Sequence, residues 1–401
     1  MRESRASFGS FSTIPRRVKW LIFAGLFNNI GIGYLLVYLT AFFPQIGVSP
    51  GVVGLLLGLE GVMLFLSIPL GIRSDRRGRK KILLIGSTVV PIPMIMMALT
   101  VNVPILVVAA LLFGVAESAF LATWNAMIAD QTDLTNRDAS FSLSFIVSGG
   151  GVAFGFLLPF FLPLVAAMTG IGIVPIHRDL LVLVGVLSFF TPLMVYATFK
   201  NYKETISPRK LIRGPNFRIL LKFSGINSII GLGAGFIIPL IPTWLFLKFQ
   251  LPDTVSGPVL AVSSLTIAMA AILSPRISKQ LGLLVAIVAT QGVSTVFMLS
   301  LALVPTAAVA IILYIIRAVL MNMASPLIDS YLMGIVTQEE RGLASAINTV
   351  VWRLPNSVST IIGGILLASR IFDLPFYLAT GLYAVAIVLL YSQFRNIHPN
   401  N

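Results

Sequence analysis

Residues 71–81 read GIRSDRRGRKK and separate two long apolar runs of the chain. Six of these eleven side chains are cationic, one is acidic, and Gly71 and Gly78 supply bends. A segment with this charge cannot enter hydrocarbon, so it marks one membrane face and orients the apolar segments on either side of it. The stretch therefore predicts a polytopic membrane protein with 71–81 as a loop between two spans.

The composition of the whole chain supports a membrane protein. The 401 residues are 57% hydrophobic and only 10% charged, whereas soluble domains carry about 25% charged residues. The apolar residues come in runs of about 20, the length that crosses a bilayer as a helix. There is no cysteine, which excludes disulfides, thiol catalysis and thiolate metal sites.

The apolar runs predict an all-α protein with twelve membrane spans. We place them at about 18–42, 51–71, 82–100, 104–129, 139–163, 179–199, 218–245, 255–275, 282–303, 306–331, 343–368 and 374–394. On this map 23 of the 28 Lys and Arg residues lie on the side that holds both termini and 71–81. The asymmetry follows the positive-inside rule and predicts a multi-pass protein of the cell membrane with both termini in the cytoplasm. The net charge of +14 thus indicates anionic lipid headgroups as partners, and no nucleic acid.

Polar segments predict the domain boundaries. We expect a cytoplasmic tail at 1–17, six-helix bundles at 18–199 and 217–394, a cytoplasmic linker at 200–216 and a short tail at 395–401. The apolar run after the first tail is too long for a signal-peptide core, so it is expected to remain as the first helix.

The two halves show an internal repeat. Gly25, Gly31 and Gly33 recur as Gly225, Gly231 and Gly233, at an offset of 200 residues. At an offset of 204, Gly78 corresponds to Gly282 and Arg137 corresponds to Arg341. The shared order and the nearly constant offset predict two halves of parallel topology.

The pattern G-x-x-x-D-R-x-G-R-K resembles the loop between helices 2 and 3 of major facilitator superfamily transporters, especially prokaryotic drug and metabolite transporters. The residues that match are Gly71, Asp75, Arg76, Gly78, Arg79 and Lys80. The second-half counterpart of this loop, PRISKQLG at 275–282, has lost the acid and most of the cations, as it has in the family. The loops at 130–140 and 337–345 are also similar to family segments. The resemblance implies two six-helix bundles and alternating access of a small-molecule substrate to a cavity lined by helices 1, 4, 7 and 10.

The resemblance also implies a gating role for 71–81. In the family the loop acid lies against the start of helix 11, so Asp75 is expected near residues 341–345, at a positive helix N-terminus. Arg79 is expected to pair with Asp130 at the cytoplasmic end of the fourth span. These contacts would hold the halves together on the cytoplasmic side until the cavity opens there.

Five ionisable residues stand out within the predicted spans, where such a group costs about 2.5–3.5 kcal/mol at a helix centre. Glu117 and Arg317 lie near the middle of spans 4 and 10, so the resemblance implies that both face the cavity. We expect Glu117 to be the main protonation site and Arg317 to be its partner or an anchor for anionic substrate groups. Glu60 is a second candidate proton site, and Asp329 with Arg353 are expected to form a structural or gating ion pair.

Polar and aromatic residues of the same spans are candidates for contact with the substrate. Besides Arg317 they are Asn29, Tyr34, Trp124, Asn125 and Asn322. Amides and phenols fix a substrate by hydrogen bonds, and indole supplies an apolar wall. Hydrogen bonding between helices is the competing explanation for such residues.

Some features depart from proton-driven drug antiporters of the family. The fourth span has no Arg, and the fifth span, SGGGVAFGFLLP at 148–159, lacks Gly-Pro. Gly151 and Gly155 in that span instead predict close helix packing. Symport, antiport and uniport therefore all stay open.

The expected function is secondary active transport of a small amphipathic or hydrophobic solute, driven by protons, by a monomer without a cofactor. A lipid transporter or flippase and an uncoupled facilitator are the alternatives on the same fold. A channel has no filter or pore-lining ring in this sequence to support it. A membrane enzyme is not expected, because two His and no Cys assemble neither a metal site nor a histidine-based triad.

Overall fold

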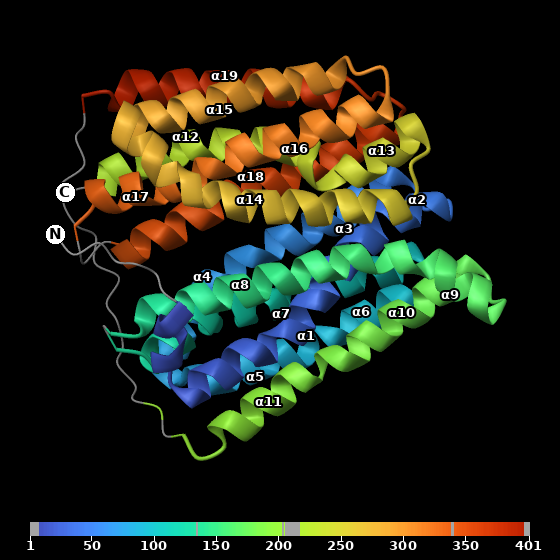
Figure 1. Ribbon diagram of the computed structural model, residues 1–401, viewed down its shortest axis with the longest axis horizontal. Helices are drawn as coiled ribbons and strands as arrows, with labels where there is room; N and C mark the ends of the chain where they lie inside the picture. The colour runs from blue at the N-terminus through green and yellow to red at the C-terminus, as the bar shows by residue number, and fades with distance from the viewer. Residues whose placement is uncertain (1–7, 134, 203, 205–216, 338–340, 397–401) are drawn as a thin grey trace. The chain divides into compact units, whose positions relative to one another are not determined.

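The computed structural model describes residues 8–133, 135–202, 204, 217–337 and 341–396, with backbone alone at 8–10, 268–273, 275 and 341–343. Within these ranges all regular elements are helices, joined by short turns (Figure 1). Residues form two compact units, 1–36 with 65–209 and 37–64 with 210–401. The unit boundary therefore moves the segment 37–64 of the first half into the unit that holds the second half.

Unit 1 is a bundle of helices with short turns between them. Its elements are η1 (Phe8–Thr13), α1 (Arg16–Val37), α4 (Ser67–Arg77), α5 (Arg79–Val89), α6 (Pro91–Leu99), α7 (Val103–Asp130), α8 (Arg137–Leu157), η4 (Leu158–Phe161), α9 (Leu162–Thr169), α10 (Ile173–Ser188) and α11 (Phe190–Phe199). α7 packs against α4, α5 and α6, and α10 packs against α6.

Part of the expected N-terminal tail belongs to this bundle. η1 is a 3-10 helix inside 1–17, and Ile14 is buried in a cluster with Val18, Leu21 and Phe199. Burial of apolar side chains stabilises a segment by about 25 cal/mol per Å², which is why this stretch folds although its composition is polar.

Unit 2 combines the second half of the chain with the segment 37–64. Its elements are η2 (Tyr38–Phe42), α2 (Phe43–Gln45), α3 (Pro50–Met63), the first residue of η3 (Leu64–Leu66), α12 (Phe217–Gly235), η5 (Ile238–Leu240), α13 (Ile241–Phe249), α14 (Asp253–Leu281), α15 (Leu283–Ala302), α16 (Ala307–Met323), α17 (Ser325–Ile335), α18 (Arg341–Ala368) and α19 (Leu374–Phe394). α18 packs against both α3 and α12, and α15 packs against α16 and α19 (Figure 1).

The helices reproduce the expected spans. In the part of the chain that the structure describes, eleven helical segments are long and apolar enough to cross a membrane. α14 covers the remaining predicted span, 255–275. In a bilayer every backbone N–H and C=O needs a partner within the segment, so a helix is the only open structure that can cross.

The basic stretch 71–81 is not an extended loop. α4 runs through Arg77 and α5 begins at Arg79, so the turn between them is Gly78 alone. Gly78 has φ 95° and ψ 139°, and its N–H donates to the Ser74 carbonyl at 2.9 Å. The helix continues past the apolar run because it satisfies its own backbone, and it ends where glycine permits a positive φ.

The same turn recurs in the second half, as the repeat predicts. Gly282 has φ 81° and ψ 155°, and its N–H donates to the Ser278 carbonyl at 2.9 Å. The stretch 275–282, expected as a loop, is likewise helical up to Leu281. The second predicted correspondence, Arg137 with Arg341, stays a prediction, because α8 begins at Arg137 whereas residues 338–340, just before Arg341 in α18, lie outside the described residues.

Candidate functional site

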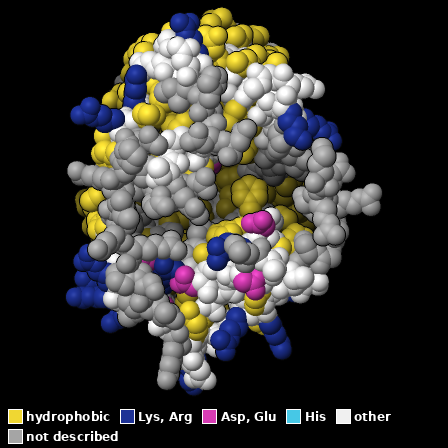
Figure 2. Space-filling model, turned by 90° about the vertical axis from the view of Figure 1, so that its left-hand side faces the viewer, with side chains coloured by type: hydrophobic (Ala, Val, Ile, Leu, Met, Phe, Trp, Pro, Cys, Tyr) yellow, Lys and Arg dark blue, Asp and Glu magenta, His cyan; other side chains and the backbone are white. Residues whose placement is uncertain are grey.

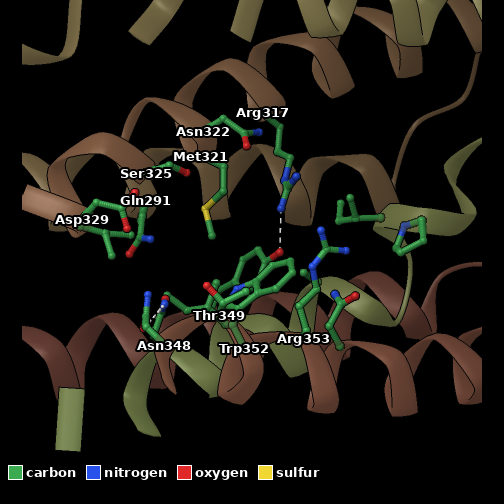
Figure 3. Close-up of a pocket in the computed structure, with 18 residues that line it drawn as sticks. Gln291, Arg317, Met321, Asn322, Ser325, Asp329, Asn348, Thr349, Trp352 and Arg353 are labelled. Atoms are coloured by element: carbon green, nitrogen blue, oxygen red, sulfur yellow. Dashed lines mark hydrogen bonds between the residues drawn. The ribbon is translucent and has the colours of Figure 1, made fainter. Parts of the chain in front are cut away.

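Unit 2 has a partly open cavity of about 480 Å³, lined by residues of α12, α15, α16, α17, α18 and α19. Its apolar wall includes Ile230, Met321 and Trp352, and its polar groups include Gln291 and Asn322. Cavities that hold drug-sized molecules measure roughly 300–1,000 Å³ and combine apolar walls with a few polar groups. The cavity in unit 2 fits that description (Figure 3).

Arg317 is the most deeply buried charge in this cavity. Its side chain extends from α16, its residue is 3% exposed, and one terminal guanidinium nitrogen donates to the Tyr383 hydroxyl at 2.6 Å (Figure 3). The guanidinium also lies 5.6 Å from the centre of the Tyr383 ring. Its Nε has no hydrogen-bond partner. Among the described residues, no carboxylate pairs with this cation.

Arg353 brings a second cation to the same cavity. It extends from α18, and Figure 3 shows Arg317 and Arg353 entering from opposite walls. The Arg353 guanidinium lies 5.9 Å from the Trp352 ring centre, a cation–π distance. Asp329, on α17, lines the cavity at the end away from Arg353 (Figure 3). The expected ion pair between Asp329 and Arg353 is therefore not formed, because the two side chains lie at opposite ends of the cavity.

Amide side chains supply the remaining polar groups. The Asn227 amide donates to Asn348 Oδ1 at 3.0 Å, which joins α12 to α18 at one end of the cavity. Asn322, a predicted substrate contact, lines the cavity and donates to the Ala318 carbonyl at 2.8 Å. Gln291 is 1% exposed, and its Oε1 accepts no hydrogen bond. The cavity thus offers a free acceptor as well as free cationic donors.

The candidates in unit 1 are mostly engaged in helix packing. The Tyr34 hydroxyl lies 3.0 Å from His177 Nδ1 and donates to the His177 carbonyl at 3.2 Å, and the two rings stack. The Trp124 indole N–H donates to the Ser144 hydroxyl at 3.2 Å, and its ring stacks on Phe120. Both residues are buried. The competing explanation, hydrogen bonding between helices, accounts for their positions in this structure.

The other candidates occupy less enclosed positions. Asn29 is half-buried and donates to the Gly25 carbonyl at 2.7 Å and to Ser148 at 3.3 Å, and Asn125 is exposed. Glu117 on α7 and Glu60 on α3 are both half-buried and both have interactions with other groups. The two predicted proton sites thus belong to different units, Glu117 to unit 1 and Glu60 to unit 2.

The predicted close packing of the fifth span is confirmed. A Cβ at Gly155 would clash with the Ile30 carbonyl and the Tyr34 backbone nitrogen, and one at Gly151 would press on Asn29 and Leu26. Both glycines allow α8 to approach the backbone of α1 closely.

The predicted contact of Arg79 with Asp130 is present in the structure. Arg79 also pairs with Asp75 at 2.7 Å and donates to the Ala126 carbonyl at 3.0 Å. The cluster joins the turn at Gly78 to the end of α7. Figure 2 looks at this end of the helices and shows Lys and Arg side chains beside Asp and Glu side chains. The expected contact of Asp75 with 341–345 depends on side chains at 341–343 that lie outside the described residues.

Glu204 is a further partner of the 71–81 stretch, and the sequence does not predict it. Its Oε1 accepts from the Lys80 backbone N–H at 2.6 Å, where the first turn of α5 carries unpaired donors and partial positive charge. Lys80 Nζ donates in turn to the Phe199 and Lys200 carbonyls. The segment after α11 is thereby docked on the turn at Gly78. Most of the expected linker, 203 and 205–216, lies outside the described residues.

The loop after α7 has its own local structure. Asp133 accepts from the Thr135 hydroxyl at 2.6 Å and from the Thr135 N–H at 2.8 Å. These hydrogen bonds hold the pKa of Asp133 below its usual range. The pKa of Tyr202 is shifted upward instead, because burial and, next, the negative charge of Asp130 disfavour its ionised form.

Comparison with known proteins assigns the family. The sequence profile of the Major Facilitator Superfamily matches residues 21–359 and 223–400. The chain belongs to the Major Facilitator Superfamily. Its twelve-helix fold is the fold of that family, and membership points to a transporter rather than an enzyme.

Individual relatives are distant. Multidrug resistance protein 2 of Bacillus subtilis (strain 168) is 29% identical over 173 residues, which cover 38% of this chain and 43% of that protein. The match thus spans less than half of the curated relative. A POT family peptide transporter has the same fold, with a TM-score of 0.75, 12% identity, and coverage of 96% of this chain and 99% of that one. A bacterial homologue of the human lysosomal transporter Spinster, in an inward-facing and occupied conformation, also has this fold. The TM-score is 0.75 at 14% identity, and the match covers 95% of this chain and 96% of that one.

Proposed function

We propose that this transporter is a proton-coupled secondary carrier of a small amphipathic or hydrophobic solute in the cytoplasmic membrane. The observation that carries the proposal is the cavity in unit 2, which combines apolar walls with amide groups, the buried cation of Arg317 and the exposed cation of Arg353. A cavity of this size and lining suits one drug-sized molecule, and carrier-type transport binds its substrate in such a site. The positive-inside distribution supports cytoplasmic termini.

Alternating access is supported by the contact between α3 and α18. A Cβ at Gly54 would clash with Gly364 and the Thr360 carbonyl, and a Cβ at Gly58 would clash with Ile361 and the Ser357 carbonyl. This close contact joins a helix of the first half to a helix of the second half within unit 2. The proposed movement of bundles 18–199 and 217–394 against each other must therefore separate α3 from α18 in one of the two access states.

Further contacts close the same region. The Thr243 hydroxyl donates to the Thr40 carbonyl, and the Gln45 amide donates to Asp253 at 3.0 Å. Each joins the segment 37–64 to the α13–α14 region. A contact made by a few hydrogen bonds and by glycine packing suits a region that forms and breaks in every transport cycle.

The proton coupling is assigned to Glu117, with Glu60 as the second candidate. Both carboxyl groups are half-buried in membrane helices, where desolvation favours the protonated form and water access or a nearby cation favours the charged form. Opening to opposite sides changes both effects, which is the requirement for a proton carrier. One proton driven by about 100 mV supplies roughly 2.3 kcal/mol.

The test measures uptake into proteoliposomes of three fluorescent probes of similar size: naphthalene-2-sulfonate, 2-naphthylmethanol and (2-naphthylmethyl)trimethylammonium. Carrier transport predicts saturable uptake of at least one probe above protein-free liposomes, increased by an imposed pH gradient. Flux that grows linearly with concentration for every probe would contradict it. The flippase alternative predicts gradient-independent movement of labelled lipid between leaflets instead.

A further inference from the structure

The buried cation of unit 2 has no carboxylate partner among the residues that the structure describes. Arg317 is almost fully buried, and its guanidinium donates to a neutral hydroxyl, that of Tyr383. A guanidinium stays protonated at every physiological pH. A buried charge without an opposite charge costs several kcal/mol, unless a ligand or water supplies what the protein does not. The structure therefore maintains a site that favours a negative charge at this point.

The free donor of Arg317 lies beside the cavity. Its Nε has no partner, and the residue lines the cavity. Arg353 enters from the opposite wall on α18, so two guanidinium groups face the space between α16 and α18 (Figure 3). Guanidinium groups match the planar, multiple acceptors of carboxylates, sulfonates and phosphates. Asp329, the carboxyl group that lines the cavity, lies at its other end.

The surroundings of the two cations are apolar. Trp352 lies between Arg353 and Asn348, and Met321 lies on the facing wall (Figure 3). Ile230 also lines the cavity. The Gln291 Oε1 is a buried acceptor without a partner and fits a donor on the ligand. A ligand that satisfies all of these groups has an oxyanion at one end and an apolar body of drug-like size.

We infer that the cavity of unit 2 binds a small soluble amphipathic anion, with its oxyanion held between Arg317 and Arg353 and its apolar body against Trp352 and Met321. The inference rests on the proposed carrier function and narrows its substrate class. The cavity of about 480 Å³ lies within the range of about 300–1,000 Å³ that suits drug-sized ligands, which favours a soluble anion over a membrane lipid.

Binding is tested on the purified full-length protein, independently of transport. Titration calorimetry compares naphthalene-2-sulfonate with its alcohol and trimethylammonium analogues, with inorganic sulfate and with a lysophosphatidylglycerol. The sulfonate is expected to bind at least about tenfold more tightly than each of the others, since a charge-assisted hydrogen bond contributes about 1.5–3 kcal/mol. Equal or tighter binding of the ammonium probe, of sulfate alone or of the lysolipid would overturn the inference.

Variants locate the site. Arg317→Gln and Arg353→Gln are each expected to weaken sulfonate binding about tenfold or more, and Arg317→Lys less than Arg317→Gln. Arg178→Gln is the matched control, because Arg178 is an exposed cation of unit 1. Trp352→Phe should reduce quenching of tryptophan fluorescence by the bound probe. If Arg317→Gln does not fold, the sulfonate affinity of Arg353→Gln and the fluorescence quenching in Trp352→Phe still test the site. Unchanged affinity in Arg353→Gln together with unchanged quenching in Trp352→Phe would overturn the inference.

Failure of this inference and failure of the proposed function have different signatures. Uptake of the ammonium or alcohol probe with no sulfonate binding would leave the carrier function intact and overturn the anion site. Arginine-dependent sulfonate binding without gradient-driven uptake of any probe would support the anion site and contradict proton-coupled transport.

Discussion

Buried hydrogen-bonding side chains of this protein divide into those with protein partners and those without. Tyr34 and His177 satisfy each other inside unit 1, and Trp124 is satisfied by Ser144. Arg317 Nε and Gln291 Oε1 are unsatisfied, and both line the cavity of unit 2. Because buried polar groups in folded proteins are nearly always paired, the unpaired donor of Arg317 and the unpaired acceptor of Gln291 can bond a ligand in this cavity. Unpaired buried atoms also occur away from it, as at Trp244 Nε1.

At the scale of single residues, Tyr34→Phe tests the structural role of the Tyr34–His177 contact. The substitution leaves the buried imidazole without its phenol partner, and a lost buried partner costs about 1–3 kcal/mol. We expect a lower midpoint of thermal unfolding, measured by tryptophan fluorescence of the protein in detergent. Tyr377→Phe, which removes a hydroxyl from an exposed ring, should leave the midpoint unchanged. An equal midpoint in wild type and Tyr34→Phe would contradict the structural role.

Cavity residues were only partly predictable from the sequence. Arg317 and Arg353 are conspicuous because charges are costly inside a span, and both were singled out. Tyr34 and Trp124 were expected to contact substrate, but helical spacing shows which residues share a face and not which helix covers that face. Tyr383 and Gln291 gave no such signal, since a Tyr or Gln in an apolar helix has many uses. Their place in the site depends on tertiary packing.

At the scale of elements, two kinds of contact join helices. The turn at Gly78 is held by charges, through Arg79, Asp75 and Asp130 in unit 1 and through Glu204 on the first turn of α5. The contact of α3 with α18 is held by close backbone approach at Gly54 and Gly58. The first kind depends on charge and the second on side-chain volume, so substitutions separate them.

Gly58→Leu tests the α3–α18 contact. The added side chain meets Ile361 and the Ser357 carbonyl, and overpacking costs about 1–3 kcal/mol. We expect a lower midpoint of unfolding and faster exchange between the two access states. The exchange is measured by the labelling rate of a single cysteine, introduced in the cavity as Ser325→Cys. The chain contains no native cysteine, so this label is unique. Gly381→Leu is the control, since nothing lies within 4 Å of a Cβ at Gly381.

Asp75→Asn tests the proposed gating role of the stretch 71–81. Loss of this charge removes one of the two carboxylates that pair with Arg79. We expect the population to shift toward the state open to the cytoplasm, so that a membrane-impermeant maleimide applied from that side labels Ser325→Cys faster. Asp138→Asn, an exposed carboxyl group at the start of α8, is the control. Labelling at the wild-type rate would argue against gating by Asp75.

At the scale of the whole molecule, topology was the part most accessible to sequence. Each expected span coincides with a helix, since a bilayer leaves the backbone no alternative, and the repeat correspondence at Gly282 holds. The extent of 71–81 was misjudged, because charge composition marks where hydrocarbon ends and not where a helix ends. Glu204 was missed for a related reason, since nothing in a polar segment shows which helix it docks on.

The central claim, proton-coupled transport through Glu117, has a direct test. The measurement is uptake of naphthalene-2-sulfonate and its two analogues into proteoliposomes, with and without a pH gradient, for wild type, Glu117→Gln and Glu60→Gln. Because Gln cannot carry a proton, we predict that Glu117→Gln abolishes the stimulation by the pH gradient while exchange of probe across the membrane at equal pH continues. Stimulation of Glu117→Gln to the wild-type extent would contradict the account.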